Sequence, residues 1–346
     1  MVYGLPRQKH ICWKLGHNFD AKSEAEENET EGGLMIYTIT LNPALDKTVV
    51  IPSFGVDQVN RITQVRLDPG GKGVNVSKMI ASLGGDSVAV AALGGMAGEQ
   101  WKQLAESCGF SVHVICAEGE TRTNVKVIDP IRHTNTDINE PGAAISQEVL
   151  LDMMAWLREV LQPEDILVLS GSVPVSVKKD MYGQLTALGR EKRAKVIVDA
   201  EGPLLDAALT AKPYLAKPNH HELAGYVGYA LDSREALMEA ARKMLQAGAE
   251  HVLVSMGPDG ALLCWMDEDH GMRYLHGSAP SVPVISTVGA GDSMVGAVAY
   301  GLEQNLSREE ILRLAVAAGT AAVTCDGSQA PDEEKIRSLL QMVNIH

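Results

Sequence analysis

Aromatic and basic side chains are scarce in this sequence of 346 residues: aromatics make up 4%, and 30 lysines and arginines stand against 44 acidic residues. The formal net charge of −14 argues against a nucleic-acid-binding protein, because such proteins usually present a basic face and aromatic side chains that stack on bases. Long apolar runs are also missing. The longest, such as 166–169 and 314–318, are far shorter than the roughly 20 residues that a membrane-spanning helix needs. We therefore expect neither nucleic acid nor a membrane among the partners.

Cysteine is sparse as well, and its spacing suggests no pairing. The five cysteines are scattered and include no C-x-x-C pair: Cys12, Cys108, Cys116, Cys264 and Cys325. This pattern indicates neither a disulfide framework nor a zinc site. The first residues carry no apolar core followed by a small-residue cleavage pattern, which argues against a secretory signal. We therefore expect a reducing, cytoplasmic setting.

The start of the chain differs in composition from the rest. Residues 22–33 read KSEAEENETEGG, with few apolar residues and no helical or strand period. We interpret residues 1–34 as a disordered extension, or as sequence upstream of a true start at Met35. Residues 35–346 then form the folded part, and a chain that is 45% hydrophobic has enough apolar residues for a full-sized core.

From Met35 onward, short apolar runs rich in β-branched residues alternate with longer amphipathic segments. This alternation predicts an α/β fold with a parallel sheet, and because the strands are apolar throughout, helices should cover both of its faces. The predicted strands are 36–41, 87–93, 166–170, 195–199 and 251–255. The predicted helices are 74–83, 98–108, 147–161, 178–193, 234–247, 290–304, 308–324 and 333–342. Residues 46–66 and 121–139 read as strands without an intervening helix, and we expect them to form a small accessory sheet, a lid over one edge.

The most informative segment is STVGAGDSMVG at 286–296. Gly289, Ala290 and Gly291 precede Asp292 at the start of a predicted helix, where small residues let the backbone approach an anion and the free N–H groups stabilise negative charge. A carboxylate in that turn suits a general base that takes a proton from an attacking hydroxyl while the N–H groups hold a phosphoryl group. The alternative for an isolated motif is that Asp292 only caps the helix.

Other glycine and serine motifs fit poorly. From Gly289 the spacing is G-x-G-x-x-x-x-G, which is not the dinucleotide-binding G-x-G-x-x-G. Lys72 is followed by Gly73 rather than by Ser or Thr, so this loop is not a Walker A motif. The run SGS at 170–172 is not a G-x-S-x-G elbow, which argues against a hydrolase nucleophile.

Seven short motifs follow one another between Met35 and Gln341. They are TLNPALD at 40–46, PGGKGVN at 69–75, TRTNVK at 121–126, SGS at 170–172, KPNHHE at 217–222, SMGPDG at 255–260 and STVGAGD at 286–292. In this order they resemble the ribokinase/PfkB family of carbohydrate kinases. The resemblance implies a ribokinase-like, three-layer α/β/α fold with a central, mostly parallel sheet and a small β-sheet lid. It also favours the base over the helix cap for Asp292.

The resemblance implies a sugar site at the carboxyl end of the first strand, where open α/β sheets bind ligands. It places Asp46 on the sugar hydroxyls, with an Asx turn beside a proline as the alternative. Arg122, Asn124 and Lys126 alternate along a strand and so share one face; Arg122 and Lys126 suit a phosphate already on the substrate, with a solvated, charged edge as the alternative. The other residues that the resemblance assigns to the substrate are Gly71, Lys72, Gly73, Asn75 and Ser172.

The resemblance places ATP beside the KPNHHE and SMGPDG motifs. Asn219 and Glu222 are spaced i, i+3 at a helix start, so they share a face and suit Mg²⁺ held mostly through water. Zinc on His220 and His221 is not indicated, because no H-E-x-x-H pattern or third ligand accompanies them. The SMGPDG motif has an ordinary hairpin turn as its alternative. The residues assigned to the nucleotide are Lys217, Asn219, Ser255, Met256, Gly257, Pro258, Asp259, Gly260, Ser286, Thr287, Val288, Gly291 and Asp292.

The reaction implied by the resemblance is an ATP- and Mg²⁺-dependent phosphorylation of D-fructose 1-phosphate at its C6 hydroxyl. Asp292 is then the base, and the amides of Gly289, Ala290, Gly291 and Asp292 form the anion hole. Two alternatives stay open: another acceptor, tagatose 6-phosphate or fructose 6-phosphate, and a sugar-phosphate sensor without catalytic activity. The resemblance also implies a homodimer packed through the lid sheets.

Overall fold

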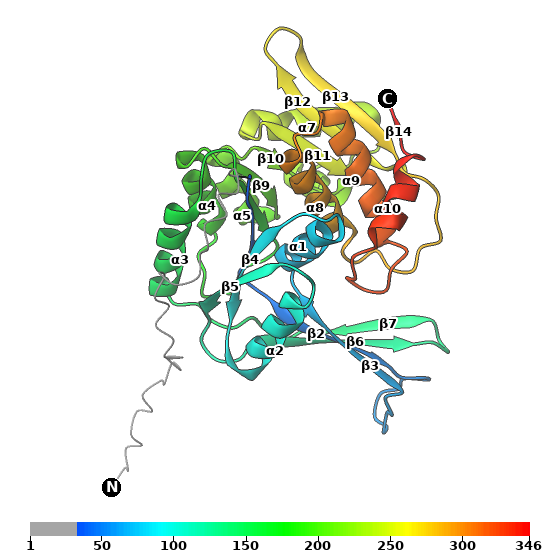
Figure 1. Ribbon diagram of the computed structural model, residues 1–346. Helices are drawn as coiled ribbons and strands as arrows, with labels where there is room; N and C mark the ends of the chain where they lie inside the picture. The colour runs from blue at the N-terminus through cyan, green and yellow to red at the C-terminus, as the bar shows by residue number, and fades with distance from the viewer. Residues whose placement is uncertain (1–32) are drawn as a thin grey trace. The chain divides into compact units, whose positions relative to one another are not determined.

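The computed structural model describes residues 33–346, so the extension expected at residues 1–34 lies outside the described residues apart from its last two. Apolar runs of the described chain form a ten-stranded sheet in the order β14-β13-β12-β11-β10-β9-β8-β1-β4-β5 (Figure 1). Its parallel part consists of β1 (Ile36–Thr40), β4 (Ser87–Leu93), β5 (Ser111–Cys116), β8 (Ile166–Ser170), β9 (Lys195–Asp199), β10 (Leu215–Ala216) and β11 (His251–Ser255). One edge is antiparallel: β12 (Ala261–Asp267), β13 (Gly271–Ser278) and β14 (Asn344–Ile345).

Alternate residues of the central strands face opposite sides of the sheet, and each side has its own core. In β8, Leu167 and Leu169 pack into one core, while Ile166 and Val168 pack into the other. The helices that contribute to the first core are α3 (Gln147–Val160), α4 (Met181–Glu191), α5 (Gly202–Thr210), α6 (His220–Val227) and α7 (Arg234–Ala247). The helices of the second are α1 (Lys72–Ser82), α8 (Ala290–Glu303), α9 (Arg308–Ala322) and α10 (Glu333–Leu340). The predicted three-layer α/β/α fold with a mostly parallel sheet is therefore confirmed.

The remaining helix, α2 (Gly95–Glu106), lies at the β4–β5 end of the sheet. Its Trp101 is fully buried and packs with β4 and with Val74 of α1. The indole N–H donates to the carbonyl of Gly70 at 3.0 Å. This bond fixes the backbone immediately before α1, whose first residues line the candidate site.

A second, four-stranded sheet has the order β3-β2-β6-β7 and projects away from the main sheet (Figure 1). Its strands are β2 (Ala44–Val50), β3 (Gln64–Gly70), β6 (Arg122–Asp129) and β7 (Thr134–Ile138). They fall in and around the stretches 46–66 and 121–139, while residues 51–63 form a loop between β2 and β3. Because β2 follows β1 closely and β3 leads directly into α1, this small sheet is joined to the edge of the main sheet where β1 ends.

Candidate active site

A cavity of about 1940 Å³ lies where the parallel strands have their carboxyl ends. Its wall takes the last residue of five strands, or the residue that follows: Thr40, Ser170, Asp199, Lys217 and Ser255. The first residues of α1 and α8 and the start of β6 also belong to the wall. Ligands of open α/β sheets bind in this position, so we take the cavity as the candidate active site.

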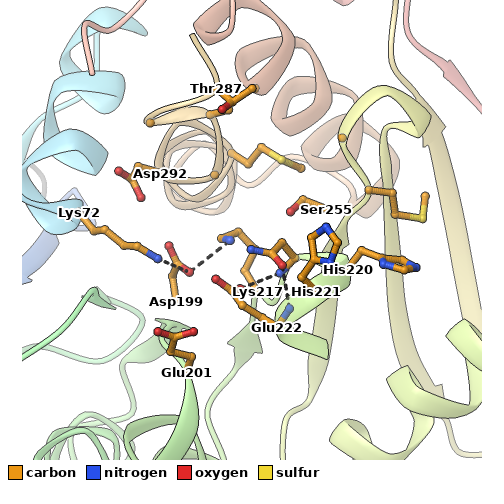
Figure 2. A pocket seen from close by; sticks show the side chains of 18 of the residues that line it. Lys72, Asp199, Glu201, Lys217, His220, His221, Glu222, Ser255, Thr287 and Asp292 are labelled. Carbon is orange, nitrogen blue, oxygen red and sulfur yellow. Dashed lines mark hydrogen bonds and ion pairs between the residues drawn. The ribbon is translucent and has the colours of Figure 1, made fainter. Parts of the chain in front are cut away.

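Asp292 lies in the first turn of α8 and faces this cavity (Figure 2). The N-cap of α8 is Gly289, whose φ of 80° is a left-handed conformation that glycine adopts without strain. Asp292 makes no capping hydrogen bond; its Oδ2 instead accepts from Asn75 Nδ2 at 2.8 Å. The helix-cap alternative is therefore wrong.

The surroundings of Asp292 favour its uncharged form. Its side chain is buried, and burial together with the nearby charge of Asp199 raises its pKa to about 6, although Lys72, Asn75 and Lys217 act in the opposite direction. The N–H groups of the first turn of α8 have no partner within the helix. The site therefore sets a carboxylate that can accept a proton near neutral pH beside donors that can hold an anion.

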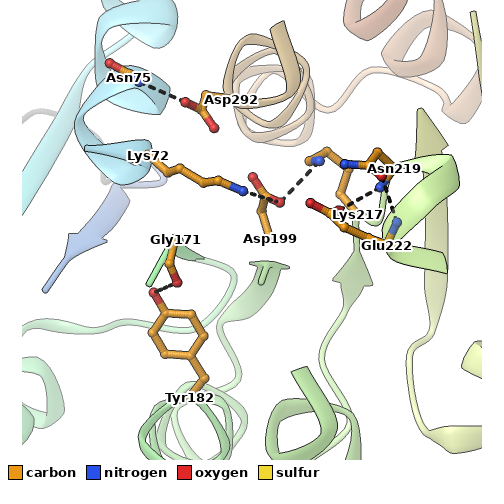
Figure 3. A network of polar contacts seen from close by, with 9 residues as sticks. All are labelled: Lys72, Asn75, Gly171, Tyr182, Asp199, Lys217, Asn219, Glu222 and Asp292. Carbon is orange, nitrogen blue, oxygen red and sulfur yellow. Dashed lines mark hydrogen bonds and ion pairs between the residues drawn. The ribbon is translucent and has the colours of Figure 1, made fainter. Parts of the chain in front are cut away.

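Asp199 was not foreseen as a functional residue, and it joins two predicted ones. Its Oδ1 lies 3.2 Å from Lys217 Nζ and 3.5 Å from Lys72 Nζ (Figure 3). Burial alone would raise its pKa, but the two ammonium groups outweigh burial and hold the pKa below its usual range. A carbon atom added to Gly291 would lie 3.3 Å from Lys217 Nζ, so this ammonium group lies against the first turn of α8. One carboxylate thus holds two cations in the cavity, one of them beside the predicted anion hole.

The predicted sugar residues come from α1, β6 and the end of β8. Gly71, Lys72, Asn75, Arg122, Asn124 and Ser172 all line the cavity. The guanidinium group of Arg122 donates to the backbone carbonyls of Asn42, Pro43 and Glu140 at 3.0 to 3.3 Å. Arginine has five N–H donors, so some remain for a ligand.

Four predicted residues stand back from the cavity wall: Asp46, Gly73, Lys126 and Ser286. Asp46 reaches it indirectly, because its Oδ1 accepts from Asn124 Nδ2 at 3.0 Å, and burial raises the pKa of Asp46. Gly73 packs against the backbone of Ile39. Lys126 lies farther along β6 and pairs with Asp137 at 3.8 Å. It can reach a ligand in the cavity only if the small sheet moves or the pair opens.

Three residues predicted for the nucleotide or Mg²⁺, Lys217, Asn219 and Glu222, lie on the side of Asp199 that faces away from Lys72 (Figure 3). Asn219 is the N-cap of α6, and a capping box joins it to Glu222: each side chain accepts from the other residue's N–H at 2.8 Å. Residues 255–260 form the turn of the antiparallel hairpin β11–β12, as the hairpin alternative expected. All six residues nevertheless line the cavity. Thr287 (Figure 2) and Val288 line the cavity too.

Buried polar atoms without partners are concentrated in this cavity. Among the described residues, six side-chain atoms are buried without a hydrogen bond, and five of them belong to residues of the cavity wall: Thr40 Oγ1, Asn42 Oδ1, Asn124 Oδ1, Ser170 Oγ and Asp199 Oδ2. Buried polar groups normally have partners, so this cluster shows that the cavity wall is polar and that its hydrogen bonds are not all made within the described chain. Thr40, Asn42 and Ser170 were not predicted as site residues.

A model of the pfkB family of carbohydrate kinases matches residues 34–335, which is most of the chain. The chain belongs to the PfkB family. A 1-phosphofructokinase from Rhodobacter capsulatus is 37% identical over 313 residues, which is 90% of this chain and 98% of the relative. The ATP-dependent 6-phosphofructokinase isozyme 2 of Escherichia coli is 36% identical, over 88% of this chain and 98% of its own.

Solved structures agree with the family assignment. Phosphofructokinase-2 from Escherichia coli in complex with fructose-6-phosphate has a TM-score of 0.81 and 33% identity, covering 89% of this chain and 99% of its own. Arabidopsis thaliana ribokinase, at 23% identity and a TM-score of 0.71, shares the fold. The predicted ribokinase-like fold and kinase class are thus confirmed.

Because the PfkB family is a family of carbohydrate kinases, membership in it implies that the chain uses ATP. Asn219 and Glu222, the residues predicted to hold Mg²⁺, fit this ion in part. In residues 33–346, no group of three or more His, Cys, Asp or Glu is arranged to hold a metal ion. Mg²⁺ usually binds proteins through one or two carboxylates and keeps several waters, and Glu222 offers one such carboxylate on the cavity wall. His220 Nε2 donates to the Leu231 carbonyl at 3.1 Å, and His221 is exposed. In the described part of the chain, no helix is long and apolar enough to cross a membrane.

Proposed function

We propose that this kinase transfers the γ-phosphoryl group of ATP to the C6 hydroxyl of D-fructose 1-phosphate, giving fructose 1,6-bisphosphate and ADP. The observation that carries the proposal is the position of Asp292. It is a buried carboxylate with a raised pKa, in the first turn of α8, between the sugar-side and nucleotide-side walls of one cavity. The 1-phosphofructokinases among the relatives support the choice of substrate.

In the transfer, Asp292 accepts the proton of the C6 hydroxyl as that oxygen attacks the γ-phosphorus. The bond between this phosphorus and the bridging oxygen breaks, and ADP leaves with the electron pair. The N–H groups of Gly289, Ala290, Gly291 and Asp292 stabilise the charge on the phosphoryl oxygens. Lys217, held beside Gly291 by Asp199, adds a positive charge at the same place.

The unpartnered atoms support a polyhydroxyl substrate on the sugar side. Asp46 fixes the direction of the Asn124 amide, since a carboxylate only accepts and Nδ2 must face it. The Asn124 side chain lines the cavity, and its buried Oδ1 has no hydrogen-bond partner in the described chain, so this amide can still accept from a hydroxyl if the wall adjusts around a sugar. We assign the substrate's phosphate to the remaining donors of Arg122 and to Lys126, the latter after its pair with Asp137 opens.

We propose that Asn219 and Glu222 hold Mg²⁺ mostly through water. Their mutual capping box uses one oxygen of each side chain, so ordered waters rather than direct bonds suit the pair. The ion would neutralise charge on the β- and γ-phosphates of ATP.

The test of the substrate is ADP release measured with fructose 1-phosphate, fructose 6-phosphate, tagatose 6-phosphate and unphosphorylated sugars. We expect the highest kcat/KM with fructose 1-phosphate. A preference for fructose 6-phosphate would favour the second candidate, which the 36% identity to the Escherichia coli 6-phosphofructokinase isozyme keeps open. A preference for an unphosphorylated sugar would overturn the roles of Arg122 and Lys126, and binding without turnover of any of them would indicate a sensor.

The fall of kcat/KM at acid pH should reflect the protonation of Asp292. Because its pKa is raised to about 6, the free enzyme loses its base as the pH falls through about 6. We expect kcat/KM to fall about tenfold for each pH unit below that point and to level off above it. Initial rates from about pH 4.5 to about pH 8 measure this. A profile that stays flat down to about pH 4.5, as a carboxyl group with the ordinary pKa of 3.8 would give, would contradict the environment described for Asp292.

We propose that the enzyme is a homodimer packed through the small sheet, which acts as a lid. Exposed apolar side chains on this sheet and its loops support the proposal: Val56, Val59, Ile62, Val65, Ile131 and Ile138, each 48 to 91% exposed. A tetrameric form has been solved for phosphofructokinase-2 from Escherichia coli. The cytoplasmic location expected from the cysteines stays a prediction.

Two charges placed in the lid should separate the dimer. Val65 in β3 and Ile138 in β7 are each 54% exposed, and we expect Val65→Asp with Ile138→Asp to give the mass of one chain in light scattering. Val175→Asp is the matched control, because Val175 is fully exposed outside the lid and should leave the dimer intact. A wild-type chain that is already monomeric would contradict the proposal.

A further inference from the structure

One buried lysine near the base has no part in the transfer as described above. Lys78 lies in α1 and is only 8% exposed. Its Nζ donates to the carbonyl of Pro69 at 2.6 Å and to Asn75 Oδ1 at 3.2 Å. Lysine is rarely buried without a strong reason, because removing an ammonium group from water is costly.

Only one orientation of the Asn75 side-chain amide satisfies both of its partners. An ammonium group can donate but not accept, so Lys78 requires the amide oxygen of Asn75 on its side. An ionised carboxylate can accept but not donate, so Asp292 requires the amide nitrogen. Lys78, Asn75 and Asp292 therefore form a chain in which each group dictates the orientation of the next.

We propose that Lys78 is a positioning residue for the catalytic base: it fixes the Asn75 amide so that Nδ2 always faces Asp292. Without this lysine the amide can turn over when Asp292 is protonated, and Oδ1 then accepts the carboxyl proton. The protonated form of Asp292 gains an acceptor that Lys78 otherwise occupies. The inference rests on the proposed role of Asp292 as the base.

The link to Pro69 adds a second fixed point. Pro69 lies at the end of β3, two residues before the Gly71 cap of α1. By bonding to this carbonyl and to Asn75, Lys78 ties the last residues of the lid strand to the side chain that orients the base. The amide is thus set by the same group that holds the lid strand at the helix.

Several charged groups surround this chain, and the test must separate them. Lys78 is influenced by Asp68 of β3, Cys108 after α2, Asp46 of β2 and Asp292 of α8; burial lowers its pKa and these groups oppose the shift. Asp292 is influenced by Asp199 of β9, by Lys72 of α1 and by Lys217 after β10. The charge of Lys78 therefore also acts on Asp292 directly, and a variant without the Asn75 amide separates this direct effect from the effect through the amide.

The decisive measurement is the titration of the Asp292 carboxyl carbon by NMR, assigned with Asp292→Asn, alongside the pH profile of kcat/KM. In Lys78→Met we expect the midpoint of Asp292 to rise by about one pH unit and the acid limb to move with it, since the protonated form gains Asn75 Oδ1 as an acceptor and a nearby positive charge is lost. Lys78→Arg keeps a charged donor and should have the wild-type midpoint. In the Asn75→Ala background, Lys78→Met should cause a clearly smaller shift, because only the direct effect of the charge remains.

A folded Lys78→Met with an unchanged midpoint would overturn the proposal, as would a full shift in the Asn75→Ala background. If Lys78→Met does not fold, neutron diffraction on the wild-type protein decides instead: deuterium on the Asn75 atom that faces Asp292 supports the proposal, and deuterium on the atom that faces Lys78 overturns it. The titration does not depend on turnover. If the wild-type enzyme is inactive with every sugar phosphate, the proposed function is wrong. The shift in the titration midpoint of Asp292 still tests the role of Lys78 in that case.

Discussion

Replacing Asp292 by asparagine is expected to lower kcat by about 10²- to 10⁴-fold, the usual contribution of a general base. Asparagine has nearly the same shape, but it cannot take the proton of the attacking hydroxyl. The N–H groups of α8 and the cations beside Asp199 remain, so residual turnover should persist. KM for the sugar phosphate should change little, because the groups assigned to its hydroxyls and phosphate are untouched. Steady-state rates with fructose 1-phosphate and ATP measure both constants.

Stability provides the control for Asp292→Asn. Because the pKa of Asp292 is raised from 3.8 to about 6 in the fold, its ionisation opposes folding; this penalty is fully present above about pH 6 and disappears below about pH 4. The asparagine variant should therefore unfold at the wild-type temperature or higher at pH 8, with the difference vanishing on acidification. Low activity with a lower melting temperature would indicate a folding defect. Turnover like that of the wild type would contradict the role of Asp292 as the base.

The layers of the fold could be predicted because the central strands are apolar on both faces. In β8, for example, no residue of the strand is exposed, and such a run is stable only between two helix layers. Helix α6 could not be predicted from periodicity, since it has eight residues and only Leu223 is buried. Its start does carry a signature, Asn219 with Glu222 three residues later, and in the structure these two residues form a capping box. The role of the same pair in holding Mg²⁺ through water stays a proposal.

The candidate site was predictable as a set of motifs but not as a network. Lys72 and Asp199 are 127 residues apart, and no local pattern indicates that they meet. The available signal was position: Asp199 ends a buried strand at the edge where ligands bind. Lys126 shows the reverse case. Alternation along β6 correctly placed it on one face with Arg122 and Asn124, but the distance along the strand takes it away from the cavity wall.

Asp199→Asn is expected to lower the free energy of unfolding by about 3 kcal/mol, because removing one partner of a buried ion pair leaves the other charge uncompensated. The two lysines should not suffer equally. The side chain of Lys217 is 3% exposed and has little contact with water, whereas that of Lys72 is 42% exposed and is better solvated. The loss should therefore come mainly from Lys217. Urea unfolding at pH 8 measures it.

A pair of double variants tests that asymmetry. Lys217→Met added to Asp199→Asn removes the stranded charge and should recover most of the lost stability, while Lys72→Met in the same background should recover little. If both double variants recover the same free energy of unfolding, the two ammonium groups are equally poorly solvated after the loss of Asp199. Asp199→Asn should also lower the pKa of Asp292, because the charge of Asp199 is one of the two causes that raise it. The acid limb of the remaining activity should then move below pH 6, which links the stability of the paired lysines to the strength of the base.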